Sequence, residues 1–469
     1  MDGQPENNRP DEPAPPSAHL VGVCGAGMKA MAELFDGLGW RLSGSDLQSP
    51  SQSVAALGLH GFQFFQGHAA DNIPTDAECL VYSPAIRPEN PERLEAARRG
   101  LPEWSYSQMI GRLMGARVGI GISGTHGKST TSAMVGWILS VAGLDPAVLV
   151  GAELCDGGQS GRAGHSGLLV VESCEFNHSF LDFQPSHAAI LNVEPDHFDR
   201  YADLPSLVQA FHEFARRLPA RGVLLVNREC AAAMESVQDV SARIVTFGND
   251  PQSDWRARNL AEDAAGIRFE ILRGNASWGT VTLRLHGAHN VQNALAAAAL
   301  CAELGVKPDD IRAGLGSFGG VKRRFEVVGG WRGVTLIDDY AHHPTAIRAT
   351  LQTARQVYGD RRIWCVFQPH QVSRTLALMD DFASSFADAD EVLIAPAFAA
   401  RERVQDEPTL VSRDLAGRIA NQGVSARFAE SLDQILTTVD DATRPGDVLI
   451  AMGAGDIDRI HHELTRRIQ

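Results

Sequence analysis

Residues 117–141 read RVGIGISGTHGKSTTSAMVGWILSV, and this stretch decides the fold of the middle of the chain. An apolar run typical of a β-strand, 117–122, leads into a glycine loop, 124–131, and then into a run typical of a helix, 132–141. Such an arrangement binds nucleotide phosphates, because glycines let backbone N–H groups approach the oxygens, the lysine neutralises charge and the following hydroxyl can bind Mg²⁺. The strict G-x-x-x-x-G-K-[ST] pattern is not met, since Ile122 stands where its first glycine would be. The alternative is a glycine turn with a surface lysine; the flanking strand and helix favour the phosphate loop.

Composition narrows the class of protein. The 469 residues carry a formal net charge of −15, which argues against a nucleic-acid partner. The seven cysteines are scattered and never form a C-x-x-C pair, which is typical of reduced thiols. Residues 1–18 are polar and proline-rich and lack the pattern of a signal peptide, so we expect a disordered tail there. No apolar run is long enough to span a membrane, and we therefore expect a cytoplasmic protein without a membrane partner.

Strand-like and helix-like runs alternate along the chain, which predicts an α/β fold built on parallel sheets. We divide the chain after the tail into three domains, at 19–116, 117–324 and 325–469. The first opens on an apolar run followed by G-V-C-G-A-G at 22–27, and Asp46 follows a second such run. This layout resembles a dinucleotide fingerprint, but its spacing is G-x-x-G-x-G and it lowers the expectation of NAD. A nucleotide site and a plain tight turn both remain open here.

Carboxylates follow two apolar runs of the second domain. Glu172 ends the run 168–171, and Glu175 comes soon after it. A carboxylate at the carboxyl end of a strand beside a phosphate loop is well placed to hold Mg²⁺. The alternative is a solvated acidic loop, which would have the same sequence pattern. The run 188–192 is followed by VEPDHFD at 193–199, where His197 stands among three carboxylates and could bind a metal or transfer a proton.

Polar residues also gather further along the chain. His289, Asn290 and Asn293 share one face of a predicted helix and suit a nucleotide base, unless Asn290 is only an N-cap. A basic run, 322–324, stands at the junction with the third domain, and arginine there suits phosphates or carboxylates. Three polar clusters, 338–344, 367–375 and 452–456, follow apolar runs of the third domain and together predict a small-ligand pocket.

In this order, these motifs closely resemble those of the Mur ligases of peptidoglycan synthesis. The resemblance spans nearly the whole chain after the tail. The motifs GTHGKS, EPDHFD, GVKRRFE, DDYAHHPT and FQPHQVSRT look most like the family member that adds the first amino acid, and the last of them argues against the related murein-peptide recycling ligase.

The resemblance implies an α/β protein of three domains: a Rossmann-like N-terminal domain for a UDP-sugar, a central P-loop ATPase-like domain and a Rossmann-like C-terminal domain. It implies ATP-dependent ligation of L-alanine to the lactyl carboxylate of UDP-N-acetylmuramate through an acyl phosphate, with Mg²⁺. The alternatives are a recycling or other Mur ligase, a nucleotide-binding regulator or transport ATPase, and a dinucleotide oxidoreductase. We expect a monomer or a weak homodimer.

The resemblance also implies roles for individual residues. The nucleotide side comprises Gly124, Thr125, His126, Gly127, Lys128, Ser129, Thr130, Asn290, Asn293, Arg324 and Asp339. The metal ligands would be Ser129, Glu172 and His197. The UDP-sugar would meet Gly25, Ala26, Gly27 and Asp46, and the alanine and lactyl groups would meet Tyr340, His343, His370 and Arg374. The catalytic group would be Lys128, Glu172, His197, Arg324, His343, His370 and Arg374.

The chain departs from the family pattern at a few of these positions. Cys24 replaces a glycine of the first loop, and Ser129 replaces the usual threonine while keeping a hydroxyl. The usual E-A-D-E-S-D reads ESCEFN at 172–177, so Cys174 and Asn177 stand where aspartates are usual.

Overall fold

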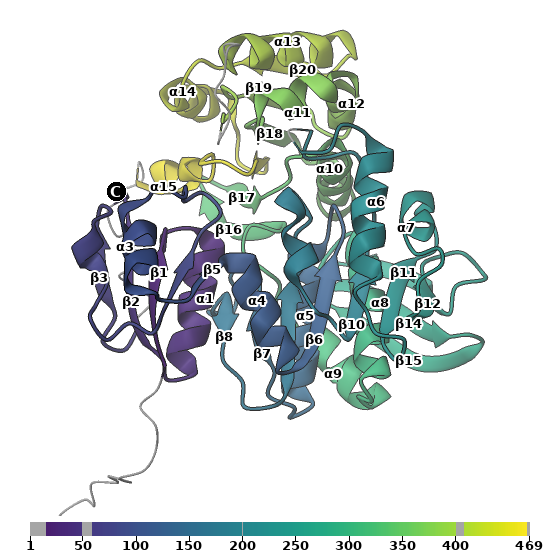
Figure 1. The fold of residues 1–469 in the computed structure, drawn as a ribbon. Helices are drawn as coiled ribbons and strands as arrows, with labels where there is room; N and C mark the ends of the chain where they lie inside the picture. The colour runs from purple at the N-terminus through teal and green to yellow at the C-terminus, as the bar shows by residue number, and fades with distance from the viewer. Residues whose placement is uncertain (1–15, 49–58, 199, 400–407, 467–469) are drawn as a thin grey trace, which may run out of the picture.

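A computed structural model describes residues 16–48, 59–198, 200–399 and 408–466. It contains three β-sheets that follow one another along the chain, each covered by helices (Figure 1). The α/β fold with parallel sheets is therefore as predicted. Asp199 and residues 1–15 lie outside the described residues.

The first sheet has the strand order β3-β2-β1-β4-β5, and all its pairs are parallel. Its strands are β1 (Ser17–Val21), β2 (Arg41–Asp46), β3 (Gln63–Gln66), β4 (Cys79–Tyr82) and β5 (Glu103–Ser105), and its helices are α1 (Ala26–Gly37), η1 (Ala70–Asn72), α3 (Pro91–Arg99) and α4 (Tyr106–Gly115). Ser17 and Ala18, which we assigned to the tail, belong to β1, where both are buried and pair with Arg41 and Leu42. Their small side chains carry little strand signal, so the sequence alone placed the boundary too late.

The second sheet has ten strands in the order β15-β14-β13-β12-β11-β10-β6-β9-β7-β8. Its parallel part comprises β6 (Val118–Ser123), β7 (Ala147–Leu149), β9 (Leu168–Glu172), β10 (His187–Ile190), β11 (Val223–Asn227) and β12 (Arg243–Phe247). At one edge β8 (Gly161–Arg162) pairs antiparallel with β7, and at the other β13 (Trp255–Asp263), β14 (Gly266–Arg273) and β15 (Ala276–Leu283) form an antiparallel extension. The helices are α5 (Lys128–Val141), η2 (Phe176–Asp182), α6 (Leu204–Ala215), α7 (Ala231–Glu235), α8 (Ala288–Glu303) and α9 (Pro308–Ser317).

The third sheet has the order β16-β17-β21-β18-β19-β20, and only β16 is antiparallel to its neighbour. Its strands are β16 (Glu326–Trp331), β17 (Val334–Asp339), β18 (Ile363–Phe367), β19 (Glu391–Ile394), β20 (Ser425–Phe428) and β21 (Val448–Met452). Its helices are α10 (Pro344–Tyr358), α11 (Val372–Ala377), α12 (Met379–Ala383), η3 (Ser384–Phe386), α13 (Pro408–Asn421), α14 (Leu432–Ala442) and α15 (Arg459–Arg466). The buried runs of β17, β18 and β21 form the centre of this part, as central parallel strands do.

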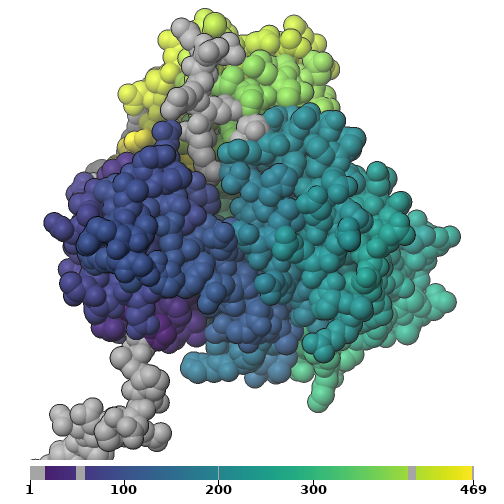
Figure 2. Space-filling model, in the orientation of Figure 1, coloured from purple at the N-terminus to yellow at the C-terminus, as the bar shows by residue number. Residues whose placement is uncertain are grey.

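The three parts pack against one another (Figure 2). The first and second lie side by side and the third lies above them, so that the carboxyl ends of the middle sheet face the third part (Figure 1). Helix α1 packs on β7 and β8 of the second part, and the buried Glu33 accepts a hydrogen bond from the backbone N–H of Gly161 at 2.7 Å. None of the helices in the part of the chain that the structure describes combines the length and the hydrophobicity that a membrane span requires.

Candidate active site

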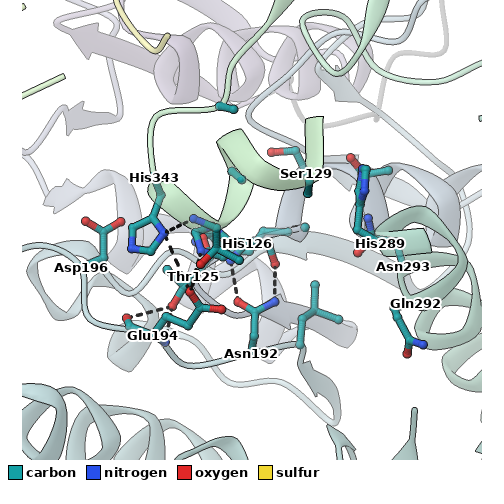
Figure 3. Close-up of a pocket in the computed structure, with 18 of the residues that line it drawn as sticks. Thr125, His126, Ser129, Asn192, Glu194, Asp196, His289, Gln292, Asn293 and His343 are labelled. Atoms are coloured by element: carbon teal, nitrogen blue, oxygen red, sulfur yellow. Dashed lines mark hydrogen bonds and ion pairs between the residues drawn. The ribbon is translucent and has the colours of Figure 1, made fainter. Parts of the chain in front are cut away.

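The predicted phosphate loop stands between β6 and α5, as its strand–loop–helix pattern indicates. Gly124 and Gly127 have φ angles of 142° and 81°, and Gly127 is the N-cap of α5. A Cβ atom on Gly127 would lie 2.4 Å from Oδ1 of Asn293, so any larger residue would require the Asn293 side chain to shift. The amide of Asn192, just after β10, accepts from the N–H of His126 at 2.7 Å and donates to its carbonyl at 3.1 Å (Figure 3). Asn192, which follows the neighbouring strand β10, thus fixes the conformation of the phosphate loop.

Lys128 opens α5 and lies against a buried carboxylate. Its Nζ donates to Glu175 Oε2 at 2.9 Å and Oε1 at 3.2 Å, and to the carbonyls of Gly124 and Thr125. Glu175 is only 1% exposed. Burial would lower the pKa of Lys128, but the nearby Glu175 carboxylate outweighs it and raises the pKa, so the lysine is charged.

A cavity of about 750 Å³ opens between the loop and the third part of the chain. It gathers most of the residues that the sequence assigned to the nucleotide, the metal and the reacting groups. Its lining includes Thr125, His126, Gly127, Lys128, Ser129, Thr130, Glu172, His197, Asn290, Asn293, Arg324, Asp339, Tyr340 and His343.

Arg324, from the junction of the second and third parts, reaches the phosphate loop. Its Nη2 lies 3.5 Å from Ser129 Oγ, and its guanidinium lies 4.9 Å from the ring centre of Tyr340. The guanidinium of Arg324 is therefore contacted on one side by the loop and on the other by the third part. Arginine in this position suits a phosphoryl group of a bound nucleotide.

The two asparagines of α8 are buried and bonded to each other. Asn293 Nδ2 donates to Asn290 Oδ1 at 3.1 Å, and Asn290 Nδ2 donates to the carbonyl of His286 at 2.8 Å. The N-cap of α8 is Gly287, so the alternative that Asn290 is only an N-cap is wrong. Beside them, burial and then Arg324 lower the pKa of His289 to about 4, so this imidazole is neutral. A neutral amide and imidazole surface remains at this end of the cavity (Figure 3).

Asp339 lies at the carboxyl end of β17 and anchors the chain where the third part begins. Its Oδ2 accepts from the N–H of Phe325 and its Oδ1 from the N–H of Ala341, each at 2.7 Å. A ribose hydroxyl would therefore have to share a carboxylate that already has two backbone donors. Asp339 holds the junction residue Arg324 in place as well as facing the cavity.

The third part contacts the segment after β10 through a buried ion pair. Arg374 Nε donates to Asp196 Oδ1 at 2.6 Å, and both side chains are at most 5% exposed. Arg374 also donates to the carbonyl of His370 at 3.1 Å. Neither His370 nor Arg374 lines the cavity, in contrast to His343. Of the four residues assigned to the alanine and lactyl groups, Tyr340 and His343 line the cavity, and Arg374 is paired with Asp196.

His343 and His126 meet around Glu194 (Figure 3). Their ring centres are 4.7 Å apart, and Glu194 Oε2 lies 3.4 Å from His126 Nε2 and accepts from Thr345 Oγ1 at 2.6 Å. Burial would raise the pKa of Glu194, but the bonds from His126 and Thr345 outweigh it and lower the pKa to about 2. Burial lowers the pKa of His343 to about 4. A carboxylate is thus kept ionised between the phosphate loop and the third part.

Oxygen donors for a cation are present on the loop side of the cavity. Ser129 and Glu172 both line it, and Glu172 Oε2 accepts from the N–H of Gly151 at 2.8 Å. A hydroxyl, a carboxylate and an ATP phosphate are the kinds of ligand that Mg²⁺ takes, so the residues present fit this ion. His197, with a φ of 54°, presents its Nε2 3.7 Å from Glu175 Oε1.

The residues assigned to the UDP-sugar lie outside the lining of this cavity. Helix α1 begins at Ala26 with Gly25 as its N-cap, and Asp46 Oδ2 accepts from the N–H of Cys24 at 2.9 Å. A Cβ atom on Gly27 would lie 3.0 Å from the ring of Tyr106. Burial, with help from the Glu172 carboxylate, raises the pKa of Tyr106, so this phenol stays neutral.

Sequence reasoning missed several residues of the cavity. Asn192 lines the cavity and holds the phosphate loop, a role that its place at the end of the run 188–192 did not predict. Glu175, which the sequence analysis named beside Glu172, pairs with Lys128 and is not in the lining of the cavity. Asn227 ends β11 and Phe247 ends β12, so their place at the carboxyl edge of the sheet was an available signal. Cys230 had no distinguishing signal.

Fold and site together define a three-part α/β protein with a phosphate-binding loop that faces charged residues of a C-terminal domain. Three family models match in order: "Mur ligase family, catalytic domain" at 17–118, "Mur ligase middle domain" at 122–301 and "Mur ligase, glutamate ligase domain" at 323–455. The chain belongs to the Mur ligase family.

Relatives and solved structures agree with this membership. The UDP-N-acetylmuramate–L-alanine ligases of Solibacter usitatus and Salinibacter ruber are 39% and 38% identical, over 97% and 94% of this chain and 96% and 92% of theirs. The crystal structure of UDP-N-acetylmuramate–alanine ligase from Thermotoga maritima superposes with a TM-score of 0.80 at 27% identity, covering 97% of this chain and 99% of that one. A murein peptide ligase from Psychrobacter arcticus gives a TM-score of 0.71 at 26% identity, covering 96% and 98%.

Proposed function

We propose that this chain joins L-alanine to the lactyl carboxylate of UDP-N-acetylmuramate, with ATP converted to ADP and phosphate. It is the first amino-acid addition in the synthesis of the peptidoglycan precursor. The observation that carries the ATP-dependent ligation is the cavity in which the phosphate loop faces Arg324 and the 339–343 segment of the third part. The substrates follow from the relatives of the same length that bear this activity in their names.

The chemistry requires positive charge at the nucleotide. A carboxylate is a poor electrophile because its leaving group would be oxide. Transfer of the γ-phosphoryl group to the lactyl oxygen makes an acyl phosphate, the alanine amine attacks its carbonyl carbon, and the tetrahedral intermediate expels phosphate. Lys128 and Arg324 are the cations of this chain that would neutralise the phosphoryl oxygens. We infer that Lys128 breaks its ion pair with Glu175 when it binds these phosphoryl oxygens.

Magnesium would be held by Ser129 and Glu172, with His197 at a second position, and would supply charge neutralisation of the phosphates. Asn290 and Asn293 would contact the adenine and Asp339 the ribose. The backbone of 124–130 would surround the phosphates, because its N–H groups lie at the N-terminus of α5.

The remaining substrate assignments rest on the family motif. Gly25, Ala26 and Gly27 would meet the UDP pyrophosphate at the N-terminus of α1, with Asp46 holding that loop. Tyr340, His343 and His370 would face the alanine and lactyl groups, and Arg374 would position the 194–197 segment through Asp196. We place the reaction in the cytoplasm and expect a monomer or weak homodimer. We propose the domain division 19–116, 117–324 and 325–469, with β1 extending the first domain to Ser17.

Phosphate release from ATP tests the proposal. The purified chain is assayed with ATP, Mg²⁺ and UDP-N-acetylmuramate, comparing L-alanine, D-glutamate and L-alanyl-γ-D-glutamyl-diaminopimelate, each also without the UDP-sugar. We expect release only when UDP-N-acetylmuramate and L-alanine are both present. Release only with the tripeptide would instead assign murein-peptide recycling, and release without the UDP-sugar would reject a ligase.

A further inference from the structure

Cys174 lies in the cavity, and the proposed ligation does not use it. It follows β9 by two residues, and it stands where the family motif has an aspartate. Donor atoms of Cys174, Glu175 and His197 all lie within 4.8 Å of one another. Two further facts distinguish this group from a lone thiol: Glu175 is 1% exposed, and His197 is only 17% exposed.

The spacing within this group suits a small tetrahedral ion. His197 Nε2 and Glu175 Oε1 are 3.7 Å apart. Two ligand atoms at about 2.0–2.2 Å from Zn²⁺ in tetrahedral geometry stand about 3.3–3.5 Å from each other. The observed separation is therefore a few tenths of an ångström too wide, which side-chain rotation can close.

The donor set determines which ion is preferred. Sulfur and imidazole nitrogen suit Zn²⁺ and similar ions, whereas Mg²⁺ takes oxygen and rarely sulfur. Replacing the usual aspartate by Cys174 therefore changes this position from an oxygen-rich one to a mixed S, N, O set.

We propose that Cys174, Glu175 and His197 form a binding site for a Zn²⁺-class cation, with water in the fourth position. When the ion binds, the S–H bond of Cys174 breaks, its proton passes to solvent and a sulfur–metal bond forms. The site goes beyond the proposed function, which gives His197 alone to a second Mg²⁺, and it is independent of which amino acid the enzyme ligates. An ion held there occupies His197, so Zn²⁺ acts as an inhibitor that competes with Mg²⁺.

Lys128 couples this site to the nucleotide. Its Nζ lies 2.9 Å and 3.2 Å from the two carboxylate oxygens of Glu175, so an incoming cation must displace it. Nucleotide phosphates attract the same lysine. Nucleotide and Zn²⁺ therefore strengthen each other's binding, and the coupling is equal in both directions.

Cobalt is the probe for the test, because a thiolate bound to Co²⁺ gives a charge-transfer band in the near ultraviolet. The full chain is titrated with Co²⁺, and Zn²⁺ is then added to displace it. We expect the band in the unchanged protein, its loss in Cys174→Ser, and a Zn²⁺ affinity at least about tenfold weaker in that variant. The matched control is Cys155→Ser, because Cys155 is also partly buried but belongs to no metal-binding group among the described residues. This variant should keep both the charge-transfer band and the Zn²⁺ affinity of the unchanged protein.

Two further measurements keep the test decisive. Lys128→Ala frees Glu175 and should tighten Zn²⁺ binding. Mass spectrometry can follow the alkylation of Cys174 in the unchanged protein. Zn²⁺ should slow this alkylation, whereas Mg²⁺ should not. The experiment does not depend on the folding of any variant. A missing band in the unchanged protein, a band that persists in Cys174→Ser, or alkylation that ignores Zn²⁺ would overturn the site. None of these readouts is ligase activity, so a failed ligation assay would leave the metal site standing.

Discussion

At the scale of single residues, Lys128 and Glu175 are charge partners, and each stabilises the other in a largely buried position. A lysine at the start of α5 that is 11% exposed needs a negative partner, and Glu175 supplies it. The same pairing gives the buried carboxyl group of Glu175 a charged partner. A phosphoryl group that takes over Lys128 therefore also releases Glu175, and this exchange links nucleotide binding to the metal side of the cavity.

Lys128→Ala separates the two roles of this lysine. Turnover should fall by at least about 10²–10³-fold, because a preorganised cation at the phosphoryl group is lost. Stability should also fall, by about 3 kcal/mol, since Glu175 is left buried and unpaired. Steady-state kinetics and urea denaturation measure the two effects.

The double variant Lys128→Ala/Glu175→Gln is the control for that experiment. It should regain most of the stability, because no charge is left uncompensated, while turnover stays low. Near-normal turnover in Lys128→Ala would contradict the assignment of the loop.

The residues also show what sequence can predict. Lys128, Glu172 and His197 were identifiable as cavity residues, because each lies at the carboxyl end of an apolar strand or in the loop that follows it, at the ligand edge of a parallel sheet. The pairing of Lys128 with Glu175 was not, since it depends on how the chain turns after β9. The partner of Arg374 was not either, because Asp196 comes from another part of the chain and the motif suggested a substrate contact.

At the scale of elements, the phosphate loop depends on α8 as much as on its own glycines. A Cβ atom on Gly127 would lie 2.4 Å from Asn293 Oδ1. The loop and the first turns of α8 are therefore in close contact at this position. The sequence pattern predicted the strand, loop and helix but gave no sign of this contact.

Gly127→Ala tests the contact. We expect nucleotide affinity to fall at least about tenfold and stability to fall by about 2 kcal/mol, because the methyl group adds a clash to the strain at a φ of 81°. Gly143→Ala is the matched control, with a φ of 75° and nothing within 4 Å of the added atom. Equilibrium dialysis with ATP and thermal unfolding compare the two. Equal effects in both variants would mean that backbone strain alone is responsible.

Helix α3 offers a pH-dependent test of the first part of the chain. Glu92, in its first turn, is buried and accepts hydrogen bonds from Ser45 and Asn72, each at 2.6 Å. Burial would raise the pKa of Glu92, but these bonds and His19 outweigh it and lower the pKa below its ordinary value of 4.5.

Because its folded pKa is lowered, ionised Glu92 contributes stability above pH 4.5, and that contribution is lost as the pH falls through the folded pKa. Glu92→Gln should therefore cost about 1–3 kcal/mol at pH 7 and progressively less below pH 4.5. Urea denaturation of both proteins over pH 3–7 measures the difference. A difference that does not change with pH would show that the charge of Glu92 is not responsible.

At the scale of the whole molecule, polar contacts join the third part to residues 194–196 of the second part. Asp196 and Arg374 form an ion pair at 2.6 Å with both side chains at most 5% exposed. His343 lies 3.2 Å from the carbonyl of Pro195, and Thr345 Oγ1 donates to Glu194 at 2.6 Å. Asp196 is the neighbour of His197, so the approach of the third part is transmitted directly to a proposed metal ligand.

The substitution Arg374→Met should therefore move the third part away from the second and also lower the turnover. Asp196 would be left without its cation, and breaking a buried pair costs about 3–5 kcal/mol unless the carboxylate regains water. The third part can give it water by moving away. We expect a larger radius of gyration in small-angle X-ray scattering, a lower kcat and a smaller loss of stability than a fixed interface would show.

The control Arg348→Met removes an exposed pair with Asp381 and should change stability by no more than about 0.5 kcal/mol. Adding Asp196→Asn to Arg374→Met removes the unpaired charge and should restore the compact form. If the radius of gyration of Arg374→Met equals that of the unchanged protein, this ion pair does not hold the two parts together.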